Sequence, residues 1–109
     1  MSLEALETVT KVLINMSEIT IFRLRIKGAV QGVGYRDWAI AEAKARGLDG
    51  WVRNRSDGSV EVLIAGPDAK VEDMLKAATQ GPDSAQVTQI DIHKETVAPE
   101  PGFARRTTM

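Results

Sequence analysis

Two periodicities alternate along the chain and limit the folds that it can adopt. Residues 19–27, ITIFRLRIK, alternate between apolar and basic side chains, which is the pattern of a strand with one buried and one solvated face. Residues 35–46, YRDWAIAEAKAR, have helical spacing instead, and Gly47 suits the C-terminal end of that helix. The chain therefore enters its regular part with a strand that is followed closely by a helix.

The same periodicities continue towards the C-terminus. They predict strands at 48–54 and 59–66, a helix at 67–80, a strand at 85–97 and a short last strand near 102–106. Between the strands at 48–54 and 59–66 lies a hairpin signal, in which Asp57 and Gly58 would supply the positive φ values of a tight turn. This order predicts an α+β fold of the ferredoxin-like βαββαβ type, with two helices on one face of a four- to five-stranded antiparallel sheet.

The first 17 residues precede this pattern. Their apolar side chains have helical spacing, but a β-branched run weakens the prediction of a helix. We expect residues 1–17 to form an N-terminal extension that is at most partly ordered, and residues 18–109 to form one domain.

Composition and charge exclude several kinds of protein. The 109 residues carry a formal net charge of −1, whereas dedicated nucleic-acid or membrane-surface binders usually have a basic excess. The chain has no cysteine and a single histidine, His93, which excludes a disulfide framework, a thiolate nucleophile and a multi-histidine zinc site. No apolar run approaches the roughly 18 residues of a membrane helix. We therefore expect a cytoplasmic monomer that uses no metal or cofactor.

Residues 28–36, GAVQGVGYR, place three glycines and an arginine at the junction of the predicted strand and helix. A glycine-rich turn that leads into a helix N-terminus presents free backbone N–H groups, and the helix dipole adds partial positive charge, so such a turn can bind an anion. Arg36 would stand in the first helical turn, where the dipole disfavours a cation unless an anion is bound. Taken alone, each feature is more often structural: a plain turn, or a solvated arginine.

The predicted topology brings Asn54 to the same edge of the sheet. A β-α-β crossover makes the strands at 19–27 and 48–54 parallel, with the strand at 59–66 between them, so that their C-terminal ends meet. The amide of Asn54 can donate to an oxyanion and accept from a water, but neither Asn54 nor Arg36 can act as a base at neutral pH. An asparagine that ends a strand before a turn is also a common structural feature.

Backbone amides, one arginine and one asparagine offer positioning and electrostatic stabilisation only. A phosphate monoester needs help with its alkoxide leaving group, whereas an acyl phosphate releases a carboxylate with a pKa of about 4. Because phosphoryl transfer depends mostly on positioning and charge stabilisation, these residues favour hydrolysis of acyl phosphates. The alternative is a non-catalytic ferredoxin-like module that binds nucleic acid or a small-molecule anion. The strand at 59–66 lacks the aromatic side chains on which an RNA-binding sheet stacks bases.

Residues 19–106 resemble the acylphosphatase family. The resemblance rests on GAVQGVGYR at 28–36 and GWVRNRSDGSVE at 50–61, with GPDSAQVTQIDI at 81–92 in the place of the family's fourth-strand segment. It implies hydrolysis of the carboxyl-phosphate bond of a small-molecule acyl phosphate, without a metal or a covalent intermediate. Inorganic phosphate would be both product and competitive inhibitor. A domain of a larger carbamoyl-transfer maturation protein is a further possibility, but the length of the chain favours a free-standing enzyme.

The resemblance also implies roles for individual residues. Arg36 matches the family's phosphate-binding arginine, and Asn54 matches the asparagine that orients the attacking water. The backbone phosphate cradle of the family corresponds to Val30, Gln31, Gly32 and Val33. Two positions depart from the family pattern, since Tyr35 stands where phenylalanine is usual and Arg55 stands where threonine is frequent.

Overall fold

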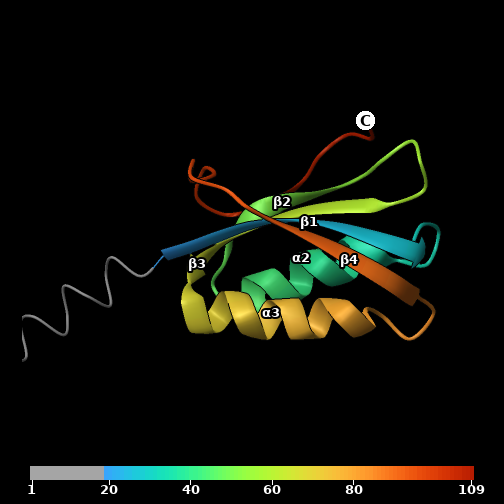
Figure 1. Ribbon diagram of the computed structural model, residues 1–109, viewed down its shortest axis with the longest axis horizontal. Helices are drawn as coiled ribbons and strands as arrows, with labels where there is room; N and C mark the ends of the chain where they lie inside the picture. The colour runs from blue at the N-terminus through green and yellow to red at the C-terminus, as the bar shows by residue number, and fades with distance from the viewer. Residues whose placement is uncertain (1–18) are drawn as a thin grey trace, which may run out of the picture.

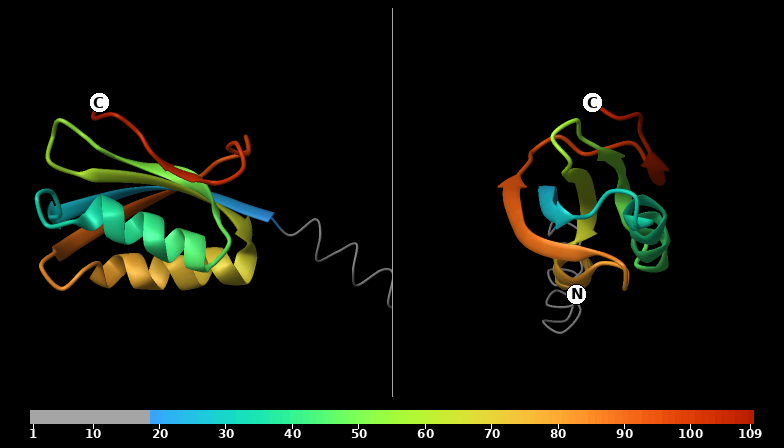
Figure 2. Two further views of the ribbon diagram at one scale, coloured as in Figure 1. Left: turned by 180° about the vertical axis from the view of Figure 1, so that it is seen from behind. Right: turned by 90° about the vertical axis from the view of Figure 1, so that its right-hand side faces the viewer.

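The computed structural model describes residues 19–109, in which two helices cover one face of a five-stranded sheet (Figure 1). The elements are β1 (Ile19–Ala29), α2 (Tyr35–Ala45), β2 (Asp49–Asn54), β3 (Val60–Pro67), α3 (Asp68–Gln80), β4 (Gln86–Lys94) and β5 (Phe103–Arg105). Figure 2 shows both helices on the same side of the sheet. The predicted ferredoxin-like α+β fold is confirmed, whereas the extension predicted at 1–17 lies outside the described residues. Of the helices in the described part of the chain, neither is long and apolar enough to cross a membrane.

The strands follow the order β4-β1-β3-β2-β5 across the sheet. Because β3 is antiparallel to both β1 and β2, these two strands run in the same direction and end at the same edge, as predicted. β5 pairs in parallel with β2, with Phe103 opposite Gly50 and Arg105 opposite Val52. The sheet is therefore mixed, and the prediction of an antiparallel sheet was wrong in this respect. β4 lies at one edge of the sheet, and residues 95–102 connect it to β5 at the opposite edge. β5 runs in the same direction as β2.

The apolar side chains of the strands and of the helices form one core between the two layers. In β1, Leu24 and Ile26 are fully buried, while Arg25 between them faces the open side of the sheet. α2 contributes the small side chains Ala39 and Ala43, and it packs against β2 and β5. α3 packs against β3, β1 and β4 through Val71, Met74 and Ala78. This packing places the N-terminus of α2 beside the end of β2.

The hairpin between β2 and β3 is a longer loop than the sequence predicts. Gly58 has a φ of 92°, as predicted. Asp57 does not adopt the predicted positive φ, because within residues 19–109 only glycines have one. The Asp57 carboxylate instead accepts hydrogen bonds from the N–H group and the hydroxyl group of Ser59, at 2.9 and 2.6 Å. The N–H group of Arg55 donates to the Ser59 carbonyl at 2.8 Å and closes the loop. Side-chain bonding by the aspartate thus replaces the left-handed backbone of a two-residue turn.

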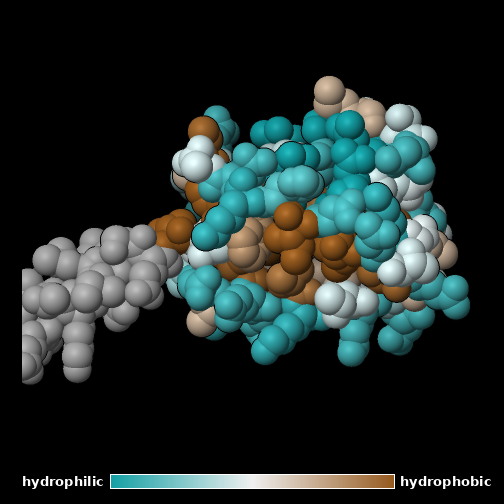
Figure 3. Space-filling view, viewed as in Figure 1, coloured by the Kyte–Doolittle hydropathy of each residue, from teal (hydrophilic) through white to brown (hydrophobic). Residues whose placement is uncertain are grey.

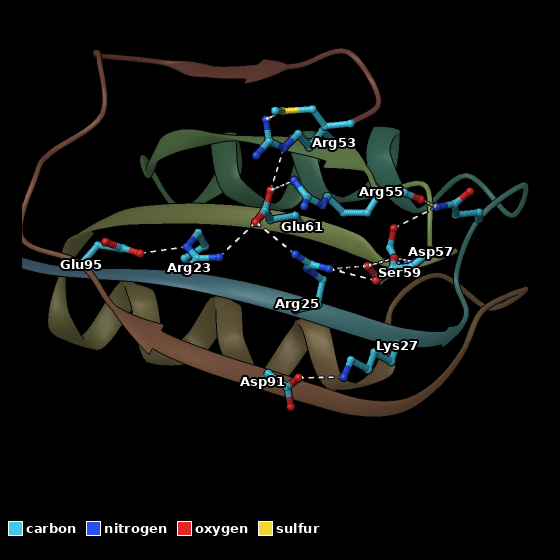
Figure 4. Close-up of polar contacts among 12 residues, drawn as sticks. Arg23, Arg25, Lys27, Arg53, Arg55, Asp57, Ser59, Glu61, Asp91 and Glu95 are labelled. Carbon is cyan, nitrogen blue, oxygen red and sulfur yellow. Dashed lines mark hydrogen bonds and ion pairs between the residues drawn. The ribbon is translucent and has the colours of Figure 1, made fainter.

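The open face of the sheet carries an ion-pair network instead of the solvated basic row that β1 alone suggests (Figure 4). Its centre is Glu61 of β3, whose side chain is 3% exposed. The arginines around the Glu61 carboxylate are Arg53 at 2.6 Å, Arg23 at 3.1 Å, Arg55 at 3.6 Å and Arg25 at 3.7 Å. Glu61 and Arg53 are partners in the β2–β3 register, so the network joins strands whose ends form the site described below.

The arginines keep Glu61 ionised in spite of its burial. Burial alone would raise the pKa of Glu61, and it is the largest single effect. Hydrogen bonds from Arg53 and Arg23, together with the charges of Arg53 and Arg55, outweigh burial and hold the pKa of Glu61 below its ordinary value. A carboxyl group with a lowered pKa stabilises the fold above its unfolded pKa, and this contribution is lost as the pH falls through the folded pKa.

Glu61→Gln is expected to lower the free energy of unfolding by about 2 kcal/mol near neutral pH, because the surrounding arginines would lose their shared carboxylate. The difference should shrink as the pH falls through the lowered pKa of folded Glu61, where the carboxylate of the parent takes up a proton. Urea unfolding near neutral pH and near pH 3 measures both effects. Glu95→Gln is the control, since Glu95 contacts Arg23 at 2.8 Å from a 36% exposed position and should contribute under about 0.5 kcal/mol. Equal stability of Glu61→Gln and the parent near neutral pH would contradict the central role of Glu61.

A band of apolar side chains lies over β4 and α3 on the face seen in Figure 3. The groove between these elements is lined by Leu75 of α3 and by Val87, Ile90 and Ile92 of β4, among others. β4 is an edge strand, and Ile92 is 47% exposed. No predicted site residue lines this groove, so the candidate site belongs to another part of the surface.

Candidate active site

The glycine run turns the chain from the end of β1 into α2. The register of β1 with β4 shifts between Lys27 and Gly28, and Gly28 has a φ of 122°. A side chain at Gly28 would collide with the backbone of Gln86. Gly34 directly precedes α2, and its φ of 80° lies in the left-handed region that favours glycine. Both glycines are therefore needed where the backbone changes direction at the strand-to-helix junction.

The turn leaves the N-terminus of α2 open. No side chain caps this helix, and the N–H group of Trp38 makes its first intrahelical bond to the Gly34 carbonyl at 3.0 Å. The N–H groups of residues 35–37 precede that bond and have no partner within the helix. Arg36 stands in this first turn. Free N–H groups, the helix dipole and the guanidinium group together favour an anion at this end of α2.

A pocket of about 90 Å³ opens at this helix end. It is lined by Val30, Gln31, Gly32, Gly34, Tyr35, Arg36, Asp37, Asn54 and Arg105. Sites for small organic ligands usually measure about 300–1,000 Å³, so this pocket suits a phosphoryl-sized group and excludes most of a larger ligand. Arg36 and Asn54, which the predicted topology brings to one edge of the sheet, do line the same pocket.

Asn54 ends β2 on the helix side of the sheet. It follows the buried Val52 by two residues, and strand alternation places both side chains on one face. The Oδ1 atom of Asn54 is buried and has no hydrogen-bond partner among the described residues. Buried polar atoms are nearly always paired in native proteins. This oxygen is therefore available to accept a hydrogen bond from a water or a ligand in the pocket.

The Gln31 side chain connects the glycine run to the hairpin that follows Asn54. Its Nε2 group donates to the carbonyl oxygens of Arg55 and Ser59, at 2.8 and 2.9 Å. These two bonds fix the distance between the loop before Arg36 and the end of β2. The sequence suggested only a backbone role for Gln31, because carbonyl acceptors 24 and 28 residues away leave no pattern in the sequence.

Asp37 and Arg105 are pocket residues that sequence reasoning did not assign to the site. Asp37 belongs to the first turn of α2, and Arg105 ends β5. The Arg105 Nη2 group and the Asp37 Oδ1 atom form an ion pair at the pocket, with side chains that are 42% and 77% exposed. The parallel pairing of β5 with β2 brings Arg105 to this position.

The arrangement can bind an anion and stabilise the charge that develops on it. Arg36 stays protonated and Asn54 is neutral, so neither side chain can serve as a base near neutral pH. The Asp37 carboxylate is engaged by Arg105. Across residues 19–109, no group of three or more His, Cys, Asp or Glu side chains is arranged to hold a metal ion.

Comparison with known proteins identifies the family. The profile of the acylphosphatase family matches residues 22–105. The chain belongs to the acylphosphatase family. An acylphosphatase of Rhodospirillum rubrum is 48% identical over 86 residues, which cover 79% of this chain and 94% of that protein. The family shows that the chain is an enzyme that hydrolyses acyl phosphates, as its motifs predicted.

Solved acylphosphatase structures share the fold. The crystal structure of acylphosphatase from Bacillus subtilis has a TM-score of 0.76 at 34% identity, covering 80% of this chain and 98% of that one. An acylphosphatase structure from Coxiella burnetii has a TM-score of 0.80 at 27% identity, covering 84% of this chain and 97% of that one. The predicted fold class is thus confirmed by comparison as well as by the element order.

Two departures from the usual acylphosphatase pattern have structural explanations. The Tyr35 hydroxyl donates to the Ala78 carbonyl of α3 at 2.7 Å, so its polar atom is satisfied inside the core, and burial raises the pKa of Tyr35. Arg55 turns towards Glu61 on the open face and does not line the pocket. Val33, predicted in the phosphate cradle, does not line the pocket either, and its side chain packs against the core.

Proposed function

We propose that this acylphosphatase hydrolyses its substrate by direct attack of a water molecule on phosphorus. Arg36 and backbone N–H groups of the predicted 30–33 loop, of which Val30, Gln31 and Gly32 line the pocket, hold the phosphoryl group. Asn54 positions the water. The observation that supports this proposal most strongly is the shared pocket. It combines the uncapped N-terminus of α2, the Arg36 guanidinium group and the unpartnered Oδ1 atom of Asn54.

The proposed reaction is a single displacement. The water oxygen forms a bond to phosphorus while the bond between phosphorus and the acyl oxygen breaks, and the acyl group leaves as a carboxylate. Because that carboxylate has a pKa of about 4, it needs no acid to protonate it. Both protons of the water remain on the phosphate product. Arg36 and the loop N–H groups stabilise the charge on the phosphoryl oxygens from fixed positions, which is the main contribution available in phosphoryl transfer.

The size of the pocket favours recognition of the phosphoryl group over the acyl group. A volume of about 90 Å³ leaves the acyl group outside the pocket. We therefore expect the enzyme to accept acyl groups of different sizes, and inorganic phosphate to compete with the substrate. A monomeric state stays a prediction of the sequence. Cytoplasmic location and independence of metals stay predictions of the sequence.

The open face of the sheet supports nucleic-acid binding less well than the pocket supports hydrolysis. The arginines there contact carboxylates, with Arg23 bound to Glu61 and Glu95, and Arg25 bound to Asp57. β3, at the centre of this face, carries no aromatic side chain for base stacking. Hydrolysis at the pocket is the better supported function.

The enzyme is expected to hydrolyse benzoyl phosphate at least about 10³-fold faster than phenyl phosphate, because the pocket lacks the acid that a phenoxide leaving group requires. Excess chelator should leave the rate on benzoyl phosphate unchanged. Initial rates on both substrates, with and without chelator, measure these effects. Similar rates on the two substrates, or loss of activity with chelator, would overturn the proposed mechanism.

A further inference from the structure

A carboxylate in the pocket of an enzyme for anionic substrates requires an explanation. Asp37 lines the same pocket as Arg36, and both belong to the first turn of α2. The negative charge of Asp37 complements the helix dipole, but it would repel a phosphoryl group bound at the same helix end. The repulsion would be considerable at low ionic strength, since charges a few ångströms apart are hardly screened.

Arg105 of β5 forms an ion pair with the Asp37 carboxylate of α2. Its Nη2 group pairs with Asp37 Oδ1, and its side chain also lines the pocket. Arg105 follows the buried Phe103 by two residues, so strand alternation directs both side chains to the helix side of the sheet. α2 packs against β5, which keeps the two charged residues together at the mouth of the pocket.

We propose that Arg105 is a positioning residue of this acylphosphatase, which cancels the charge of Asp37 and so allows the phosphoryl group to bind. The inference rests on the proposed function of the pocket. Arg105 acts through Asp37, while Arg36 holds the substrate. The ion pair is largely exposed, so its effect on binding depends on salt.

A purely structural role of Arg105 makes a different prediction. If the ion pair only anchors β5 to α2, Asp37→Asn and Arg105→Gln break the same contact. The double variant is then no more active than either single variant. If the charge of Asp37 is what matters, Asp37→Asn tightens phosphate binding and restores the activity that Arg105→Gln loses. The double variant therefore separates the two roles.

Arg105→Gln is expected to reduce kcat/KM for benzoyl phosphate and to weaken inhibition by inorganic phosphate, each about fivefold at low ionic strength. Both losses should fall below about twofold in about 1 M salt. Asp37→Asn should tighten phosphate inhibition about threefold, and the double variant should lie within about twofold of the parent. Steady-state kinetics at two ionic strengths, with circular dichroism to check folding, measure these values.

Arg106→Gln is the matched control. It removes the same charge from the neighbouring residue, whose guanidinium group lies 4.7 Å from the centre of the Trp51 ring and outside the pocket. It should stay within about twofold of the parent at both salt concentrations. Arg105→Lys, which keeps the charge, should recover most of the activity.

The outcomes separate this inference from the proposed function. If Arg105→Gln behaves like Arg106→Gln, or if adding Asp37→Asn does not restore the activity that Arg105→Gln loses, the proposed role of Arg105 is overturned. The proposed function of the pocket is unaffected by either result. Should Arg105→Gln fail to fold, unchanged phosphate inhibition in Asp37→Asn would overturn it, and tighter inhibition would support it. A parent that neither hydrolyses benzoyl phosphate nor is inhibited by phosphate would instead overturn the proposed function, and with it the inference.

Discussion

Arg36→Ala is expected to lower kcat/KM for benzoyl phosphate by about 10²–10³-fold, which is the usual loss when one donor to a developing oxyanion is removed. Inhibition by inorganic phosphate should weaken at the same time, because the same guanidinium group holds the product. Arg105, the other arginine that lines the pocket, is occupied by Asp37 and does not replace Arg36. Arg36→Lys should also be impaired, since an ammonium group cannot hold two phosphoryl oxygens in a bidentate way.

The control for Arg36 is a charge at the other end of the same helix. Lys44 is exposed in the last turn of α2, so Lys44→Ala removes one positive charge without touching the pocket. It should retain the activity of the parent, and both variants should remain folded by circular dichroism. A folded Arg36→Ala enzyme that binds phosphate as tightly as the parent would move the anion site to another part of the surface.

Asn54→Ala is expected to lower kcat by about 10²-fold while phosphate inhibition stays close to that of the parent. The amide acts on the attacking water, whereas Arg36 and the loop N–H groups hold the phosphoryl group. Stability should change little, because the Oδ1 atom of Asn54 has no hydrogen-bond partner to lose among the described residues. Initial rates, phosphate inhibition and urea unfolding of the same protein separate these effects.

Asn54→Asp has nearly the shape of the parent side chain and adds a negative charge at the pocket. It should therefore lose activity and also bind phosphate more weakly, with a larger effect at low salt. Full turnover in Asn54→Ala would show that the asparagine only ends β2, and the catalytic role at position 54 would have to be withdrawn.

The meeting of Arg36 and Asn54 at one pocket could be predicted, because local signals and one topological rule suffice for it. The glycines and Arg36 are adjacent in the sequence, between a clear strand pattern and a clear helical pattern. The parallel arrangement of β1 and β2 around β3 then brings Asn54 to the same edge. None of these steps depends on side-chain contacts between remote residues.

The remaining features depend on contacts that leave no local pattern. β5 has three residues, too few for a period to show, and its parallel pairing with β2 is what brings Arg105 to Asp37. Asp57 adopts its conformation because Ser59 offers two donors, which turn propensity alone does not reveal. Glu61 did leave a signal, since it is the single charged residue of the apolar strand β3 and a buried carboxylate requires cationic partners.

The location of the phosphoryl group can be tested most directly by titrating ¹⁵N-labelled enzyme with inorganic phosphate and following the backbone amide resonances. Binding at the proposed site predicts saturable shifts concentrated at residues 30–36 and at Asn54. The same shifts should be nearly absent in Arg36→Ala at equal phosphate concentration. Saturable shifts confined to another surface, with residues 30–36 unchanged in the parent, would contradict a phosphate cradle at the N-terminus of α2.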